Sequence, residues 1–334
     1  MAEYIESLRR ELESLDVSGP LTTVYLGGGT PSRLGAPGIR DVLALIRSRF
    51  ALEPGAEVTI EANPDDVAAG DALGWIDAGV NRISLGVQSF DDNVLKWMHR
   101  VHDSRAAVDS FEILRAAGFE NISIDLIFAL PESSQRSWQR DLEMAIGMGP
   151  QHISLYGLTV EPSTPLSRWT ESGNVTVADE DRYAEEFLLA DRLTRAAGYE
   201  HYEVSNFALP GMRSRHNSAY WSGAKYVGVG PSAHSFDGEK RSWNVKHYAE
   251  WVSRLSRNEL VVAGSERLTQ ANRLAEKVYL GLRTHDGLPV SSSYDKPIRS
   301  WTENGWARVD GDVIRLTSEG WLRLDSLAAA LTAV

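Results

Sequence analysis

The sequence contains no cysteine among its 334 residues. Disulfide bonds and thiolate metal sites are therefore excluded for these residues. A cysteine-ligated iron–sulfur cluster is excluded in the same way, because its irons are normally held by thiolates. No apolar run reaches the roughly 18 residues that span a bilayer, and the first residues lack the basic and then apolar pattern of a secretory signal. We therefore expect a cytoplasmic protein with no integral membrane segment.

Basic residues are also few, since 34 lysines and arginines face 46 aspartates and glutamates, for a net charge of −12. Such a balance argues against general nucleic-acid binding, which needs a positive surface. Hydrophobic residues make up 43% of the chain and charged residues 24%, as in ordinary soluble globular proteins. The length suggests one large domain and a smaller one.

Strand and helix patterns alternate along residues 1–205. Short apolar runs predict strands at 22–26, 57–61, 82–87, 123–128, 152–156 and 201–204. Apolar spacing of three or four residues predicts helices at 3–14, 38–49, 67–78, 91–98, 104–117, 134–147 and 179–197. This alternation predicts an α/β domain with a parallel sheet, either open or closed towards a barrel.

The rest of the chain divides into two parts. Residues 206–260 are rich in Gly, Ser and aromatics with weak periodicity, and we expect a loop-rich connecting segment there. In 261–334, a helix at 269–282, a further helix, a two-strand wing at 307–309 and 313–316, and a last helix predict a winged-helix-like module. Basic and acidic residues are equal in number over 265–334, so we expect no binding of nucleic acid by this module.

Polar residues stand at the ends of successive predicted strands. Gly27–Gly29 follow the first strand, Glu61 and Gln88 follow the next two, and Asp125 lies inside the fourth. Singly, each has an ordinary explanation: a tight turn, a capping carboxylate, a solvated amide or an ion pair. Together they favour a barrel-like sheet, because active sites of (β/α) barrels form at the carboxyl ends of the strands.

Several motifs, in order along nearly the whole chain, carry a family resemblance. They are Tyr25-Leu26-Gly27-Gly28-Gly29-Thr30-Pro31, Glu61-Ala62-Asn63-Pro64, Gly86-Val87-Gln88-Ser89-Phe90, Met98-His99-Arg100-Val101-His102, Asp125-Leu126-Ile127-Phe128-Ala129-Leu130-Pro131 and Ser154-Leu155-Tyr156-Gly157-Leu158-Thr159-Val160-Glu161-Pro162. This set resembles the haem-chaperone and oxygen-independent coproporphyrinogen III oxidase-like family of the radical S-adenosylmethionine (SAM) superfamily.

The resemblance implies a partial (β/α) barrel of radical SAM type that lacks its first strand. It also implies that SAM is bound by one set of residues: Gly27, Gly28, Gly29, Thr30, Glu61, Gln88, Arg100 and Asp125. The family carries a Cys-x-x-x-Cys-x-x-Cys motif for a [4Fe–4S] cluster, which this sequence lacks. Either the protein is a natural short form or the sequence starts too late. We expect the second, because a missing strand would leave an unpaired sheet edge.

A second motif resembles the His-Asn-x-x-Tyr-Trp signature of the haem-chaperone branch. It consists of His216, Asn217, Tyr220 and Trp221 in the segment 206–260, and the resemblance implies haem binding there. We expect His216 to ligate the haem iron, with His234 as the runner-up, since imidazole is a common haem ligand. Arg213 and Arg215 could pair with the propionates. The alternative is a histidine that only orders its loop.

The leading functional hypothesis is a haem-binding chaperone that delivers haem to acceptor proteins of unknown identity and retains a SAM site. One alternative is a truncated radical SAM oxidoreductase of the coproporphyrinogen oxidase type. Another is a degenerate SAM-binding protein with no role in haem transfer. Since no residue here can ligate the cluster, we assign no catalytic residue and leave enzymatic activity open.

Overall fold

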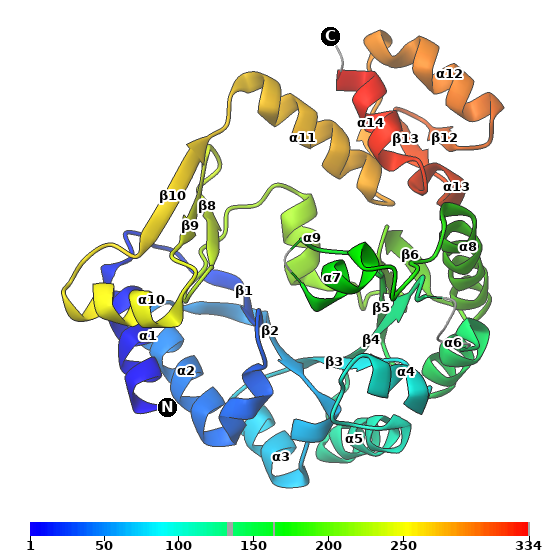
Figure 1. Ribbon diagram of the computed structural model, residues 1–334. Helices are drawn as coiled ribbons and strands as arrows, with labels where there is room; N and C mark the ends of the chain where they lie inside the picture. The colour runs from blue at the N-terminus through cyan, green and yellow to red at the C-terminus, as the bar shows by residue number, and fades with distance from the viewer. Residues whose placement is uncertain (132–135, 163, 333–334) are drawn as a thin grey trace.

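A curved sheet of seven strands forms the centre of the computed structural model, which describes residues 1–131, 136–162 and 164–332 (Figure 1). The strand order is β1-β2-β3-β4-β5-β7-β6. The strands are β1 (Leu21–Leu26), β2 (Leu52–Ala62), β3 (Arg82–Gln88), β4 (Ile122–Phe128), β5 (His152–Gly157), β6 (Glu200–Glu203) and β7 (Asn206–Ala208). The curl of this sheet confirms the expected partial (β/α) barrel.

The first five strands run parallel, whereas the last two do not. β7 pairs antiparallel with β5, and β6 pairs antiparallel with β7. The expectation of a wholly parallel sheet is therefore wrong at this edge. The reason is local: only Val204 and Ser205 separate β6 from β7, and a connection this short allows a hairpin but not a crossover.

Helices cover the outer, convex face of the sheet (Figure 1). They are α2 (Gly35–Arg49), α3 (Ala69–Asp77), α5 (Ser104–Ala117), α6 (Trp138–Gly147) and α8 (Glu180–Ala196). The helix expected at 134–147 is α6, and its first two expected residues lie outside the described residues. Fully buried apolar side chains of these helices, such as Leu43, Trp75 and Leu114, pack with Ile83 and Ile124 of the sheet. The burial of this layer leaves the concave face free for a site.

The segment 206–260 has more regular structure than its composition predicts. After β7 it contains α9 (Arg215–Trp221), β8 (His234–Phe236), β9 (Lys240–Asn244) and α10 (Tyr248–Ser256). With β10 (Val262–Arg267), the strands β8 and β9 form a small antiparallel sheet. Irregular stretches such as residues 222–233 still separate these elements, so the division of the chain at 206–260 stays a prediction.

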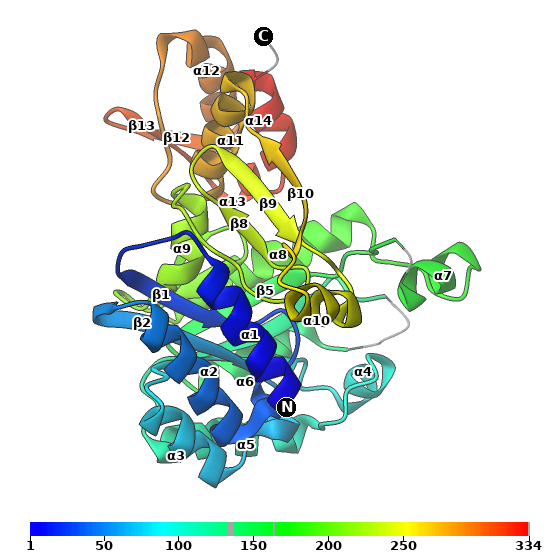
Figure 2. The ribbon, with the colours of Figure 1, turned by 90° about the vertical axis from the view of Figure 1, so that its left-hand side faces the viewer.

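The N-terminal helix α1 (Ala2–Ser14) joins this small sheet to the barrel. It lies beside α10 and α2 in both ribbon views (Figures 1 and 2). Its buried Glu11 accepts hydrogen bonds from the Gly230 backbone N–H, Asn244 Nδ2 and Trp251 Nε1. Burial raises the pKa of Glu11, although these three donors oppose the shift.

The C-terminal module has the helices and the wing that the sequence predicts. It comprises α11 (Gln270–Arg283), β11 (Leu288–Pro289), α12 (Asp295–Glu303), β12 (Ala307–Asp310), β13 (Val313–Leu316), α13 (Ser318–Trp321) and α14 (Leu324–Thr332). Trp321 Nε1 donates to the Leu282 carbonyl oxygen, which ties α13 to α11. Within the described residues, no helix is both long and apolar enough to cross a membrane.

Candidate functional site

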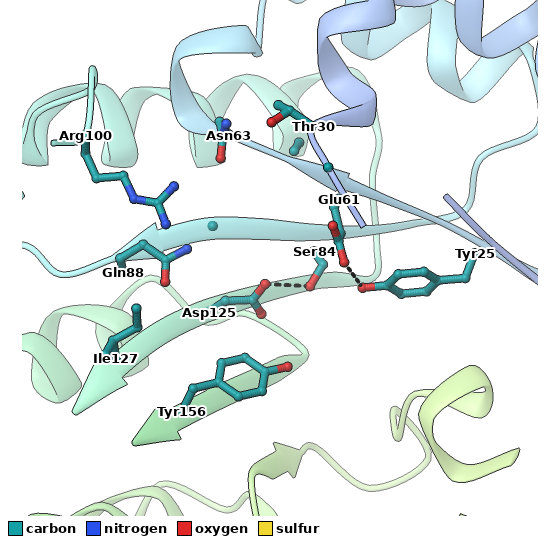
Figure 3. Close-up of a pocket in the computed structure, with 13 residues that line it drawn as sticks. Tyr25, Thr30, Glu61, Asn63, Ser84, Gln88, Arg100, Asp125, Ile127 and Tyr156 are labelled. Atoms are coloured by element: carbon teal, nitrogen blue, oxygen red, sulfur yellow. Dashed lines mark hydrogen bonds between the residues drawn. The ribbon is translucent and has the colours of Figure 1, made fainter. Parts of the chain in front are cut away.

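A cavity of about 390 Å³ opens on the concave side of the sheet, at the carboxyl ends of the parallel strands (Figure 3). Its walls come from β1 to β5 and from the loops that follow them. The residues that line it are Tyr25, Gly29, Thr30, Glu61, Ala62, Asn63, Ser84, Gly86, Gln88, Arg100, Asp125, Ile127 and Tyr156. We call it the strand-end cavity.

Two carboxyl groups define one side of the strand-end cavity. Tyr25 donates its hydroxyl to Glu61 Oε1 at 2.7 Å, and the Gly28 N–H donates to Glu61 Oε2 at 3.2 Å. Asp125 accepts from Ser84 Oγ at 2.7 Å and from Ser123 Oγ at 3.0 Å. Burial raises the pKa of both carboxyl groups, although these hydroxyl donors oppose it. A cation bound between them would lower both pKa values, because it favours the ionised carboxylates.

The opposite side of the strand-end cavity carries a cation and two amides. Arg100 extends towards Gln88, and Asn63 lies to the right of Arg100 in the view of Figure 3. Burial lowers the pKa of Arg100, and the charge of Asp65 opposes that shift. Gln88 has φ 70°, a left-handed backbone that is uncommon outside glycine. A Cβ at position 86 would lie 2.9 Å from Gln88 Nε2, so Gly86 allows the amide to fold back towards the cavity.

Most of the residues expected to bind SAM come together here. Gly29, Thr30, Glu61, Gln88, Arg100 and Asp125 line the strand-end cavity, whereas Gly27 and Gly28 do not. Their roles as ligands stay predictions. Six further lining residues were not expected as ligands from the sequence: Tyr25, Asn63, Ser84, Gly86, Ile127 and Tyr156. Strand alternation could have found several of them, since residues two apart share a face: Ser84, Gly86 and Gln88, or Asp125 and Ile127.

The helix α9 carries the His-Asn-x-x-Tyr-Trp motif, so the expectation that His216 lies outside regular structure is wrong. Ser214 caps this helix by accepting the N–H of Asn217 at 3.2 Å. Glu57, from β2, accepts the backbone N–H groups of Arg215 and His216, each at 2.9 Å. Serine is a favoured residue at the N-terminus of a helix, but a helix of seven residues gives little periodicity in the sequence.

Both ring nitrogens of His216 have partners inside the protein. Nδ1 lies 2.9 Å from Thr23 Oγ1, and Nε2 lies 3.1 Å from the Tyr220 hydroxyl. The ring stacks on Tyr25, with centroids 4.8 Å apart and planes 15° apart. Burial lowers the pKa of His216 despite the opposing charge of Glu57. The imidazole is therefore neutral at neutral pH and held in a fixed orientation.

The two arginines expected to meet haem propionates are engaged elsewhere. Arg213 forms ion pairs with Glu200 at 3.2 Å and with Asp286 at 3.1 Å. Arg215 Nη1 donates to the Gly55 carbonyl oxygen at 2.7 Å. Pairing of Arg213 or Arg215 with haem propionates stays a prediction, and it would have to compete with these internal partners.

A second cavity, of about 500 Å³, lies between α9, the small sheet and α11, and we call it the α9 cavity. Tyr220 and Trp221 of the motif line it together with Tyr226 and Phe236. Its charged lining residues are Arg241, Arg273, Lys277 and Glu276, and Glu276 forms an ion pair with Arg241. Sequence reasoning missed these cations, because they come from β9 and α11, distant in sequence from the motif.

The remaining predicted residues lie near this region without lining either cavity. Asn217 sits in the first turn of α9. His234 begins β8 and is exposed, with its ring 6.2 Å from that of Trp243. His216 is not among the residues that line the α9 cavity, but its partner Tyr220 is. The assignment of His216 or His234 as a haem ligand stays a prediction.

Comparison with known proteins shows which protein family has this sequence and architecture. The model of the radical SAM superfamily matches residues 2–145. A protein of Mycobacterium tuberculosis described as "Heme chaperone HemW" is 37% identical over 335 residues, which cover 98% of this chain and 86% of that protein. The chain belongs to the HemW family. A HemW of Bacillus subtilis is 33% identical over 304 residues, 89% of this chain and 80% of the relative.

The fold is shared more widely than the HemW family. The structure of coproporphyrinogen III oxidase (HemN) from Escherichia coli matches with a TM-score of 0.83 and 20% identity, over 99% of this chain and 83% of that one. This likeness shows the common fold alone. It agrees with the curved sheet and the C-terminal module described above.

Membership of the radical SAM superfamily implies SAM and a [4Fe–4S] cluster, and the present residues fit only the first. The strand-end cavity offers acidic, amide and guanidinium groups to a polar ligand, and a Cβ at Gly29 would meet open space. By contrast, the sequence has no cysteine. No group of three or more His, Cys, Asp or Glu in the described ranges could hold a metal ion. The 334 residues therefore do not supply a cluster site.

Proposed function

We propose that this HemW-family protein is a cytoplasmic haem chaperone, which binds haem beside α9 and delivers it to acceptor proteins. The observation that carries this proposal is the identity of 33–37% to proteins described as haem chaperones, over most of the chain. That similarity includes the segment with the His-Asn-x-x-Tyr-Trp motif. Family membership and the position of the motif thus support the same function.

The α9 cavity has the chemistry that haem requires. Haem is a flat, largely apolar ring with two carboxylates, so it binds best between aromatic side chains with cations at one edge. Trp221, Tyr226 and Phe236 provide the aromatic surface, and Arg273 and Lys277 provide cations on α11. The Nε1 of Trp221 is buried and has no hydrogen-bond partner among the described residues. His216 of the motif does not line the cavity itself, but its Nε2 forms a hydrogen bond with the hydroxyl of Tyr220, which does.

The strand-end cavity supports the binding of SAM as a second part of the proposal. SAM carries an ammonium group, a sulfonium, a carboxylate and ribose hydroxyls. Glu61 and Asp125 match the positive groups or the hydroxyls, and Arg100 matches the carboxylate. When bound, SAM would add a positive sulfonium to a side of the cavity that now holds two carboxyl groups.

The alternative, an oxidoreductase of the coproporphyrinogen oxidase type, has weaker support. The likeness to that enzyme is 20% in sequence, whereas HemW relatives reach 37%. Both comparisons cover nearly the whole chain, so the difference lies in the sequence identity. The chaperone is therefore the better-supported function.

Delivery of haem distinguishes a chaperone from a protein that only stores it. The chain is loaded with haem and mixed with haem-depleted candidate acceptors, while apomyoglobin in a parallel sample reports spontaneous release. We expect transfer to a true acceptor to exceed the rate to apomyoglobin and to rise with acceptor concentration. Transfer to every acceptor at the spontaneous rate would show that the chain binds haem without delivering it.

A further inference from the structure

The histidine of the motif is poorly placed to bind iron directly. Nδ1 of His216 meets Thr23 Oγ1, and Nε2 meets the Tyr220 hydroxyl. Stacking on Tyr25 and two backbone bonds at the start of α9 fix the ring in this position. To ligate iron, Nε2 would have to give up its bond to Tyr220, and the residues that line the α9 cavity do not include His216.

Tyr220 is a motif residue that is partly exposed and also forms a hydrogen bond with His216. Its side chain lines the α9 cavity, and the residue is 37% exposed. Tyr226 packs edge-on against it, with ring centroids 4.8 Å apart, and this contact limits its rotamers. Trp221 follows on the same cavity wall. Tyr220 therefore forms part of the wall of the α9 cavity, with its hydroxyl at His216 Nε2.

The hydrogen bond between these two residues suits a phenolate ligand. Tyrosine is one of the side chains that bind haem iron in proteins. A metal ligand is usually oriented, and made more basic, by a hydrogen bond from an outer partner. With Nδ1 of His216 protonated and donating to Thr23 Oγ1, Nε2 is the acceptor that Tyr220 needs.

We infer that Tyr220 is the residue that binds the haem iron, and that His216 is a positioning residue that holds and polarises it. This inference rests on the proposed haem function and changes its ligand. On binding ferric haem, the phenolic oxygen of Tyr220 forms the bond to iron and gives up its proton, which Nε2 of His216 accepts and passes on to solvent. The haem carboxylates then lie towards Arg273 and Lys277 on α11, since Arg241 is already paired with Glu276.

Substitutions of Tyr220 and His216 distinguish which of the two residues binds the haem iron. Ferric haem is titrated into the wild type, Tyr220→Phe, His216→Ala and the distant control Tyr248→Phe, with absorption and resonance Raman spectra at each ratio. We expect the wild type and the control to show a high-spin ferric spectrum with phenolate-to-iron charge transfer. Tyr220→Phe keeps the aromatic ring and should lose that signature. His216→Ala should keep it with a shifted iron–phenolate stretch and about three- to tenfold weaker binding, the loss of one hydrogen bond.

The other outcomes are equally informative. A nitrogen-ligated spectrum in the wild type that persists in Tyr220→Phe and vanishes in His216→Ala would overturn the assignment of Tyr220 and leave the haem function intact. If the folded wild type takes up no haem, both the assignment and the proposed function fail. Thermal unfolding of each variant shows that the spectra report on folded protein.

Discussion

Asp125 and Glu61 are the two carboxyl groups on which the SAM proposal depends. Both lie in the strand-end cavity, and hydroxyl groups of Ser84 and Tyr25 respectively donate to them at 2.7 Å. Because a parallel sheet brings strand ends to one edge, the sequence could place them near each other. It could not show that their hydroxyl partners, which come from neighbouring strands, would be serine and tyrosine.

Replacement of Asp125 by Ala should weaken SAM binding by about 1.5–3 kcal/mol, the loss of a charge-assisted hydrogen bond. Isothermal calorimetry on the wild type and the variant measures this difference. Asp77→Ala is the matched control, because Asp77 is exposed on the outer helix α3 and should leave the affinity unchanged. Equal affinities of wild type and Asp125→Ala would place the ligand elsewhere.

The affinity for SAM should also depend on pH. Burial raises the pKa of Glu61, and the charge of Asp125 adds to the rise, although the bond from Tyr25 opposes it. Ionised carboxylates favour the cationic ligand, so the affinity should fall as the pH is lowered through these raised pKa values. Glu61→Gln should flatten the pH profile measured by calorimetry. An unchanged slope in that variant would exclude Glu61 as the titrating group.

Secondary-structure elements were predictable to different degrees. The strands β1 to β5, the outer helices and the C-terminal wing follow from their apolar spacing, and the structure confirms them with shifts of their ends, the largest at β2, which begins at Leu52 and not at Glu57. The short elements α9, β8 and β9 were not predictable by the same means. Their positions depend on tertiary contacts. For example, Glu57 lies on β2, more than 150 residues before α9, and accepts hydrogen bonds from two backbone N–H groups of α9. No local pattern reports such a contact.

The contact between α1 and the small sheet depends on one buried carboxylate. Glu11→Ala would leave the Trp251, Asn244 and Gly230 donors without their acceptor, and we expect a loss of about 2–4 kcal/mol in the free energy of unfolding. Urea denaturation measures this loss. The control Glu13→Ala removes an exposed partner of Arg9 on the same helix and should change stability by less than about 0.5 kcal/mol. Similar losses in the two variants would refute a special role for Glu11.

Across the whole molecule, one side chain connects the two candidate sites. The Tyr25 hydroxyl bonds to Glu61 in the strand-end cavity, while its ring stacks on His216. His216 in turn reaches Tyr220 at the α9 cavity. The sequence showed both motifs and could not show that β1 brings them together. A folded barrel is needed for that adjacency.

The 334 residues should bind no [4Fe–4S] cluster and should not cleave SAM reductively, because they contain no cysteine. Anaerobic reconstitution with iron and sulfide, followed by iron analysis and an assay for 5′-deoxyadenosine, provides the measurement. Heat-treated protein, handled identically, reports iron that adsorbs without a site. Stoichiometric cluster uptake together with product formation would refute this prediction.

The central claim is that haem binds in the α9 cavity, and an equilibrium titration followed by the Soret band tests it most directly. We expect saturation at one haem per chain for the wild type and for Arg299→Glu, a charge reversal at an exposed position on α12. Reversal of both Arg273 and Lys277 to Glu should weaken haem binding by about tenfold or more, since the haem carboxylates lose two cationic partners. A wild type that shows no saturable Soret change, or a double variant that binds haem as tightly as the wild type, would contradict haem binding in the α9 cavity.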